Sequence, residues 1–327
     1  MPKLSRSNHL QPWHNGSYLA FNARSGAVAL LDRDSYATFE QLSGKLRANW
    51  SGPWSADEEK LLKQMLYGSF ACEDDFSEID WLKFEHNKAR YDETTLGVVI
   101  APTMACNMAC SYCFEANKAG RMSDETIQHV IDFIAKRANS LKGLEITWFG
   151  GEPLLAMDTI ERLSRAFIGL SETHAFDYIS SIVTNGYLLN AETVDRLTAL
   201  KCRSAQVTLD GPSQMHNRKR PLKNGRPSFE TIIRNIQYAV TRMGVSVRVN
   251  VDRSFTAETI CELMSELTQA DLQDKVWVNF GMLEAATSVC SNISDTCYAA
   301  ADFSKVEAEY FALLLNGGFR IQKLPAP

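Results

Sequence analysis

The feature that most constrains the fold is a repeated alternation of apolar, β-branched runs with helical patterns, which begins at Leu96. The runs have the composition of strands that are buried on both faces. They are Leu96–Ala101, Leu144–Phe149, Tyr178–Thr184, Ala205–Asp210, Val245–Val251 and Val276–Gly281. Because successive right-handed β/α units build a parallel sheet that curves toward a barrel, six such units predict an α/β fold with an open, partial (β/α)6 TIM-like barrel.

Helices are expected between these strands. Ser123, Asn190, Ser228 and Thr256 each precede an apolar pattern of helical spacing, and their side chains are typical N-caps. A last helix is expected over Phe303–Leu315. In such folds the chemistry lies at the carboxyl ends of the strands, on the loops that follow them.

The first 95 residues follow a different pattern. Ser17–Phe21 and Ala27–Leu31 indicate two short strands joined by a turn, and Ser35–Leu46 and Ala56–Tyr67 indicate two helices. A charged linker is expected over Glu78–Thr95. We therefore predict a small, winged-helix-like α+β module, which is a possible peptide-recognition domain.

The domain boundaries follow from these patterns. The N-terminal module is expected over residues 1–95 and the β/α core over residues 96–316, with a tail over residues 317–327. No long basic run is present and the formal net charge is −5, so nucleic acid is not an expected partner. No apolar stretch approaches the ~18 residues that a membrane helix needs, and no secretory signal precedes the module, so we expect a cytoplasmic protein without a membrane partner.

Three of the eight cysteines lie within one short loop, Cys106-Asn-Met-Ala-Cys110-Ser-Tyr-Cys113, directly after the first core strand. In a cytosolic protein the cysteines should be reduced, so disulfides are a poor explanation for this cluster. Three cysteines so close together indicate metal ligation. Three thiolates can ligate three irons of a cubane cluster and leave the fourth iron open to an external ligand. Structural zinc sites usually have four protein ligands, and no second cysteine pair lies nearby. The spacing alone leaves zinc open as an alternative.

This loop, in this position, resembles the signature of the radical S-adenosylmethionine (SAM) superfamily. The resemblance covers about two thirds of the chain, roughly Leu96–Leu315, and within the superfamily it is to peptide- and protein-modifying maturases, including anaerobic sulfatase-maturating enzymes. It implies that Cys106, Cys110 and Cys113 hold a 4Fe–4S cluster whose open iron binds SAM. It further implies that one electron, from a donor such as flavodoxin or ferredoxin, cleaves SAM to methionine and a 5′-deoxyadenosyl radical, which abstracts hydrogen from the substrate.

Two glycine-containing elements follow the next strands. Gly150-Gly151-Glu152-Pro153 comes directly after the second strand, where glycines allow a close approach of the backbone and a carboxylate can accept from a cationic amine. It resembles the family element that contacts the amino group of SAM. Thr184-Asn185-Gly186 follows the third strand, and the resemblance gives Thr184 a place at the edge of the SAM pocket. An ordinary turn is the alternative for Thr184-Asn185-Gly186.

The stretch Thr208-Leu-Asp-Gly-Pro and the basic loop after it carry the remaining resemblance. In the family, a hydroxyl at the position of Thr208 binds the ribose, and an arginine matching Arg220 holds the SAM carboxylate. Arg218 competes with Arg220 because the register of this loop is open. The resemblance also places the backbones of Tyr112 and Leu283 near the adenine, although a packing role for either side chain is an equal alternative.

The chain departs from its closest family resemblance at its end. Related maturases continue into a cysteine-rich SPASM domain that binds auxiliary clusters, whereas this sequence stops at Leu324-Pro-Ala-Pro327. We therefore expect a chain that lacks this domain, and no catalytic acid or base is assigned.

The expected function is SAM-dependent radical modification of a ribosomally made peptide or a protein. The N-terminal module resembles domains that bind a leader peptide as an added strand, although a stabilising cap on the barrel is the alternative. Two other functions stay open: oxidation of a sulfatase cysteine or serine to formylglycine, and binding of SAM or a leader peptide without turnover by a truncated chain.

Overall fold

The computed structural model describes residues 2–115, 120–285 and 287–321. The chain divides into two compact units, the first ending at Asp92 and the second beginning at Glu93. Each unit has its own hydrophobic core, so each is described by itself.

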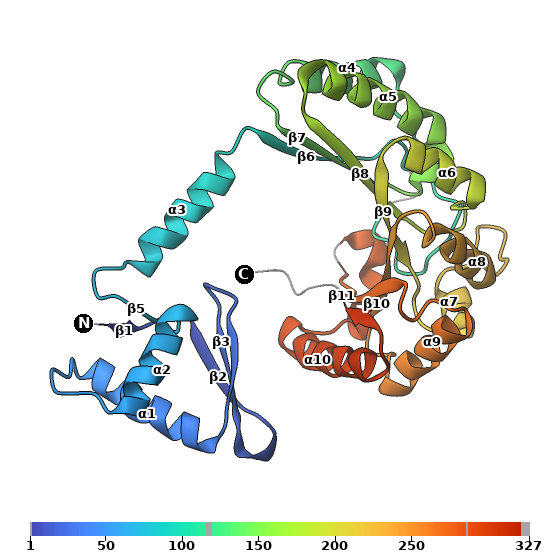
Figure 1. The fold of residues 1–327 in the computed structure, drawn as a ribbon. Helices are drawn as coiled ribbons and strands as arrows, with labels where there is room; N and C mark the ends of the chain where they lie inside the picture. Colours follow the sequence, from blue (N-terminus) through green and yellow to red (C-terminus); the bar gives the residue numbers. More distant parts are fainter. Residues whose placement is uncertain (1, 116–119, 286, 322–327) are drawn as a thin grey trace. The chain divides into compact units, whose positions relative to one another are not determined.

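The second unit is built on a curved, all-parallel sheet with the strand order β12-β11-β10-β9-β8-β7-β6 (Figure 1). Its strands are β6 (Thr95–Ile100), β7 (Gly143–Trp148), β8 (Asp177–Thr184), β9 (Cys202–Thr208), β10 (Gly244–Val251), β11 (Val276–Met282) and β12 (Arg320–Ile321). The predicted α/β class and partial barrel are confirmed. The two-residue strand β12 was not predicted, because so short a strand carries no periodicity to detect.

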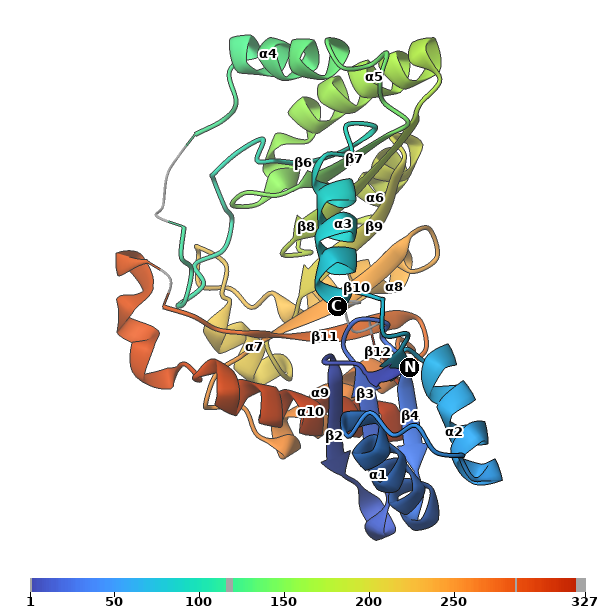
Figure 2. The same ribbon diagram turned by 90° about the vertical axis from the view of Figure 1, so that its left-hand side faces the viewer.

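Helices cover the outer face of the curved sheet (Figure 1), and Figure 2 shows the same arrangement after a quarter turn. The α-helices are α4 (Asp124–Ala135), α5 (Met157–His174), α6 (Ala191–Ala199), α7 (Ser213–Lys219), α8 (Phe229–Ala239), α9 (Ala257–Gln269) and α10 (Ala300–Asn316). Two 3-10 helices are η2 (Pro153–Ala156) and η3 (Ser288–Thr296). Their apolar sides join the sheet in one core, which includes the fully buried Trp148 and Phe167.

Strand β10 shows how the sheet separates its two faces. Val245, Val247, Val249 and Val251 are fully buried under the helices, whereas the residues between them are half-buried on the inner face. The expectation that the strands are buried on both faces is wrong for β10, because the open barrel leaves its inner side available to polar groups.

All four predicted cap residues occupy N-cap positions, and three of them make the side-chain capping hydrogen bond. The side chains of Ser123, Asn190 and Thr256 each accept a hydrogen bond from the backbone N–H three residues later. Ser228 is the N-cap residue of α8, as predicted, but its hydroxyl makes no capping hydrogen bond and instead donates to the carbonyl oxygen of Arg220 at 2.9 Å. Ser228 therefore contributes to the loop geometry of the site described below.

The first unit contains two small antiparallel sheets and three α-helices. Its strands are β1 (Lys3–Leu4), β2 (Asn8–Pro12), β3 (Tyr18–Asn22), β4 (Val28–Leu31) and β5 (Ala71–Cys72), paired in the orders β1-β5 and β2-β3-β4. Its helices are η1 (His14–Gly16), α1 (Arg33–Arg47), α2 (Ala56–Tyr67) and α3 (Glu78–Arg90). The predicted hairpin and the first two α-helices are therefore present.

The segment predicted as a charged linker, Glu78–Thr95, is in large part helix α3, a helix not among those predicted from the sequence. The Ser77 side chain accepts from the Asp80 backbone N–H as an N-cap. Acidic residues occupy the first turn and basic residues, Lys88 and Arg90, the last turn, which is the distribution that stabilises a helix dipole. The order of these charges along the segment, acidic first and basic last, favours a helix.

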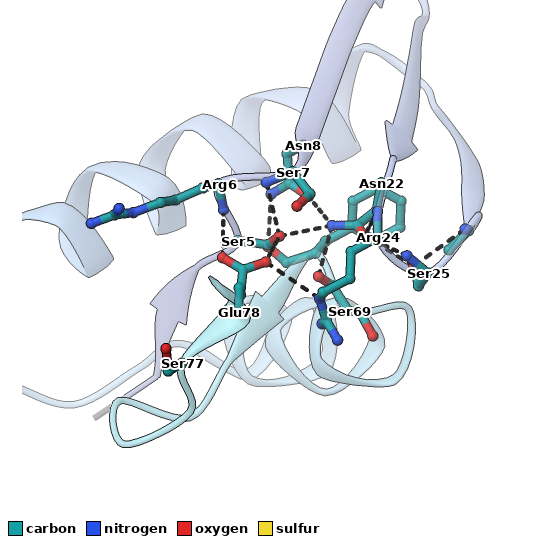
Figure 3. Close-up of polar contacts among 12 residues, drawn as sticks. Ser5, Arg6, Ser7, Asn8, Asn22, Arg24, Ser25, Ser69, Ser77 and Glu78 are labelled. Atoms are coloured by element: carbon teal, nitrogen blue, oxygen red, sulfur yellow. Dashed lines mark hydrogen bonds and ion pairs between the residues drawn. The ribbon is translucent and has the colours of Figure 1, made fainter. Parts of the chain in front are cut away.

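A buried polar network fastens the start of α3 to the hairpin of the first unit (Figure 3). The Glu78 carboxylate accepts from the Arg6 backbone N–H at 2.8 Å and lies 3.3 Å from Arg24 Nε. Burial alone would raise the pKa of Glu78, but hydrogen bonds from Ser5 and Arg6 and the charge of Arg24 hold it below its usual value. The Asn22 amide is fully buried and donates to the Ser5 hydroxyl at 2.9 Å. These contacts fix the entry into α3.

Candidate functional site

A cavity of about 490 Å³ lies at the carboxyl ends of the parallel strands of the second unit. Ten of the eleven site residues expected from the sequence line it, and they come from the loops and strand ends after β6 through β11. These ten are Cys106, Cys110, Tyr112, Cys113, Gly150, Gly151, Thr184, Thr208, Arg220 and Leu283. Glu152 is not among the lining residues. The fold therefore gathers residues spread over most of the core at one edge of the sheet.

The cysteine loop is held in place by the last residue of α7 and the segment that follows it. The backbone N–H of Ala109 donates to Pro221 O at 2.9 Å, and that of Ser111 donates to Lys219 O at 3.1 Å. Met108, between the first two cysteines, is buried and forms a β-bridge with Leu222. The loop that carries the thiols is thus positioned by a partner segment far along the chain.

The three thiols differ in their exposure. Cys106 and Cys110 are half-buried and Cys113 is exposed, and in the described part of the chain the three are not gathered into a closed metal-binding group. Burial raises the pKa of Cys110 to about 11 and also raises the pKa of Cys106. Both are therefore neutral thiols at pH 7, and a metal that binds them must displace their protons.

Gly150 and Gly151 permit the end of β7 to approach the start of the cysteine loop. A Cβ atom on Gly150, whose φ is +113°, would lie 2.3 Å from Thr103 O. A Cβ atom on Gly151 would lie 2.4 Å from Met104 O. Because neither clash can be relieved by rotating a flexible side chain, this approach requires glycine at both positions.

Glu152 joins the ends of two neighbouring strands. Its carboxylate is fully buried and accepts from Thr184 Oγ1 at 2.8 Å, Asn185 N at 2.8 Å and Leu154 N at 3.1 Å. Burial raises the pKa of Glu152 more than these donors lower it. The side chain therefore orders the Thr184 turn in this structure. Its role toward the SAM amino group stays a prediction.

Arg220 is the centre of a buried polar cluster. Its guanidinium donates to the Tyr112 hydroxyl and lies 3.7 Å from Asp210 Oδ2, and the Tyr112 hydroxyl donates to the same carboxylate. Asn250 closes the cluster, with its Nδ2 3.2 Å from the Tyr112 hydroxyl. Burial alone would lower the pKa of Arg220, but Tyr112, Cys110 and Asp210 raise it above its usual value. Arg218, the competing candidate, is exposed and does not line the cavity.

The residues present fit the two cofactors that the sequence suggests. Three thiols lie in one loop beside the cavity, which is the donor set of a cubane cluster with one open iron. Arg220 Nε is buried and has no hydrogen-bond partner among the described residues, so the cavity presents a donor that a ligand carboxylate can satisfy.

His216 positions the strand end and the Arg220 loop. Its Nδ1 accepts from the Asp210 backbone N–H at 3.2 Å, so Nε2 carries the proton and donates to Ser228 Oγ at 3.1 Å. Ser228 in turn donates to Arg220 O. Burial, followed by the charge of Arg220, lowers the pKa of His216 from 6.5 to about 3. The imidazole is therefore a neutral structural group at pH 7.

This burial predicts a pH dependence of stability. The unfolded chain takes up a proton at His216 below about pH 6.5, whereas the folded chain does so only near pH 3. The contribution of His216 to stability is therefore constant above pH 6.5 and falls as the pH decreases. The expected slope from this residue approaches about 1.4 kcal/mol per pH unit. Urea unfolding of the metal-free protein at pH 7, 6 and 5 measures the effect. His216→Asn should be less stable at pH 7 and lose less on going to pH 5; equal slopes would contradict the assignment.

Sequence reasoning assigned no role to several polar residues of the inner face. Gln206, Arg248 and Asn250 line the cavity, and Asn185, noted only as part of a turn, places its Nδ2 3.8 Å from Cys106 Sγ. The available signal was a polar residue between two buried valines near the end of a strand, as in Val-Arg-Val-Asn-Val.

Comparison with known proteins places this site in a family. Residues 100–267 match the model of the radical SAM superfamily, which is just over half of the chain. A probable GTP 3′,8-cyclase of Methanopyrus kandleri is 35% identical over 178 residues, which are 54% of this chain and 53% of that protein. A serine-type anaerobic sulfatase-maturating enzyme of Bacteroides thetaiotaomicron is 30% identical over 158 residues, 43% of this chain and 36% of that enzyme. The chain thus spans about half or less of the length of these curated relatives.

Solved structures share the fold. One of anSMEcpe with bound AdoMet and a Cp18Cys peptide has a TM-score of 0.57 at 21% identity, over 69% of this chain and 63% of that one. One of Streptococcus suis SuiB bound to its precursor peptide SuiA has a TM-score of 0.52 at 15% identity, over 100% of this chain and 74% of that one. No helix among the described residues is long and apolar enough to cross a membrane.

The family match covers the cysteine loop, the Gly-Gly-Glu-Pro element and the Thr208 stretch, which are the motifs on which the sequence prediction depended. The predicted recognition is confirmed, and with it a 4Fe–4S cluster and SAM as the cofactors of the family. The chain belongs to the radical SAM superfamily.

Proposed function

We propose that this chain is a radical SAM enzyme that modifies a peptide or protein substrate. The observation that carries the proposal is the convergence of three cysteine thiols, a buried arginine with an unsatisfied donor and two backbone glycines on one cavity. When bound, the cluster and SAM supply a 5′-deoxyadenosyl radical that removes a hydrogen atom from the substrate. The chain's own residues bind, orient and shield these groups.

Each of the eleven residues receives a role in this proposal. Cys106, Cys110 and Cys113 hold the cluster, Arg220 binds the SAM carboxylate and Thr208 binds the ribose. Gly150 and Gly151 form the edge that faces the SAM amino group, Thr184 completes that edge, and Glu152 supports it from behind through its hydrogen bond to Thr184. Tyr112 and Leu283 lie beside the adenine. Leu283 is buried at the rim of the cavity, which suits this role.

The first unit supports a peptide substrate. The outer edge of β4 is not paired with another strand among the described residues, and Val28 and Leu30 on this strand are 64% and 62% exposed. An exposed strand edge flanked by apolar side chains can accept an extended peptide as an added strand. SuiB, which shares the fold along the whole chain, binds a precursor peptide. We infer a peptide-recognition domain in residues 1–95 and a radical SAM core in residues 96–316.

A second candidate function is maturation of a sulfatase. It is favoured by the 30% identity to the serine-type anaerobic sulfatase-maturating enzyme. The curated relatives include a probable nucleotide cyclase as well, so similarity in the core does not by itself select the substrate.

Anaerobic reconstitution tests the proposal. The protein is loaded with iron and sulfide and mixed with dithionite and SAM, and 5′-deoxyadenosine and methionine are quantified. Equal amounts of both products are expected, and a peptide encoded beside the gene should accelerate their release and change in mass. Acceleration by a sulfatase-derived cysteine or serine peptide instead would favour the second candidate. A bound cluster without cleavage under any condition, or zinc on the cysteine loop, would contradict the proposed enzyme.

A further inference from the structure

We propose that Arg248 binds a carboxylate of the substrate, so that the preferred peptide carries an aspartate or glutamate beside the residue that is modified. The inference rests on the proposed function and deepens it. It depends on the position of Arg248 in the cavity, on the way its guanidinium is held, and on the charges around it.

Arg248 projects from the inner face of β10 into the cavity. Its neighbours across the sheet are Thr208 on β9 and Asn279 on β11, and it is half-buried. The fully buried valines on either side of it face the helices, so the alternation of the strand directs Arg248 to the opposite face. A long basic side chain inside a partial barrel is costly to bury unless it meets an anion.

The guanidinium is held in one orientation before any ligand binds. Arg248 Nε donates to Asn250 Oδ1 at 3.0 Å, and the backbone N–H of Asn250 donates to Asp210 Oδ1 at 2.9 Å. Gly281 provides the space, since a Cβ atom there would lie 2.2 Å from Arg248 Nη2. With Nε occupied, the two terminal nitrogens are the donors that remain for a ligand. A positioned guanidinium is the group that best binds a carboxylate through two parallel hydrogen bonds.

Arg248 also carries an unmatched charge. Among the described residues, no carboxylate oxygen lies within the 4.0 Å of an ion pair with Arg248, whereas Arg220, the other arginine of the cavity, is paired with Asp210. Of the acidic residues at the cavity, Glu115 is half-buried and Glu284 is exposed, and neither forms an ion pair with Arg248 among the described residues. Because the buried Nε of Arg220 already offers a donor for the SAM carboxylate, a second anion is needed to match Arg248.

The rest of the inner face indicates what kind of molecule carries that anion. Val99, Ile179 and Trp277 occupy inner-face positions of their strands and are 68%, 43% and 37% exposed. These side chains do not line the cavity, but they make the rest of the inner face apolar, and one unpaired cation on such a face suits a peptide segment with one acidic residue. The described lining of the cavity includes two cations, Arg220 and Arg248, and Arg220 is already paired with Asp210. A nucleoside triphosphate would require more positive charge than this, so the charge of the cavity argues against that substrate class.

A randomised peptide library tests the inference. The library is captured under anaerobic conditions on the full chain, loaded with its cluster and SAM and without reductant, and the bound peptides are sequenced. The wild-type protein should enrich aspartate or glutamate at one position. Arg248→Gln should reduce that enrichment at least tenfold, and Arg248→Glu should select lysine or arginine instead. Arg203→Gln is the matched control, because Arg203 is an exposed arginine of β9 that does not line the cavity.

A second measurement tests whether Arg248 binds a carboxylate of the peptide or the carboxylate of SAM. Calorimetric titration with SAM should give the same affinity, within twofold, for wild type and Arg248→Gln, and thermal melting should show both to be folded. A tenfold loss of SAM affinity in folded Arg248→Gln would assign Arg248 to the cofactor and overturn the inference. In the library experiment, an acidic preference that survives Arg248→Gln, or that is absent from the wild-type protein, would also overturn it. Release of 5′-deoxyadenosine by the wild-type protein tests the proposed function independently of these results.

Discussion

Cys110→Ala should bind no 4Fe–4S cluster and release no 5′-deoxyadenosine above background. Cys110 lies between the other two thiols in the loop and lines the cavity, so its removal leaves two ligands where three are needed. Iron and sulfide content, the visible absorption of the cluster and product release after addition of dithionite and SAM measure the effect. The expected loss is complete rather than partial, because the cluster is the source of the electron that cleaves SAM.

Cys202→Ala is the matched control for this experiment. Cys202 is fully buried in the hydrophobic core at the start of β9, and it is not among the residues that line the cavity. The control should retain its iron and its activity. A Cys110→Ala protein that keeps a full cluster, or a control that loses it to the same degree, would contradict the ligand assignment.

Arg220→Met should lower the free energy of unfolding by about 3–5 kcal/mol, because it removes one partner of a buried ion pair and leaves the other without its cation. Asp210 is fully buried, and Arg220 is the cation paired with it in the described structure. The same variant should lose most of its SAM affinity, since the proposed carboxylate donor is gone. Urea unfolding and calorimetric titration with SAM measure the two effects.

Two further variants make the Arg220 result interpretable. Arg218→Met changes the exposed neighbour and should alter neither stability nor SAM affinity, which decides between the two arginines that the sequence left open. Arg220→Met combined with Asp210→Asn removes the stranded charge and should recover part of the stability but none of the SAM affinity. Full recovery of SAM binding in the double variant would show that Arg220 acts only on the fold.

The architecture of the core was predictable because its strands carry their signal locally. Val245–Val251 alternates large apolar residues with polar ones, and the strand found, Gly244–Val251, differs from the expected one by a single residue. The motifs that follow these strands were therefore expected to lie close together, because all strands of a parallel sheet direct their carboxyl ends to the same edge. Ten expected residues on one cavity follow from that constraint.

What the sequence did not reveal depends on contacts between distant segments. Ser228 is a typical cap residue, but its hydroxyl is hydrogen-bonded to the Arg220 carbonyl and to the His216 ring. No local sequence pattern predicts these two contacts. In the sequence, Arg248 is one polar residue within a strand. It lines the cavity only because the inner face of the sheet is open. Glu152 is an exception of another kind, since its motif was noted but its buried hydrogen bonds to the next turn were not expected.

The backbone bridge between the cysteine loop and the segment after α7 has a thermodynamic consequence. Met108 pairs with Leu222, and the hydrogen bonds on either side of this pair join stretches that lie far apart in the sequence. Whatever tightens the thiol loop must therefore also restrain the stretch that presents Arg220. Cluster insertion and the ordering of the nucleotide pocket are in this way parts of one cooperative event, so a metal-depleted chain should bind SAM poorly even though every nucleotide-contacting side chain is intact.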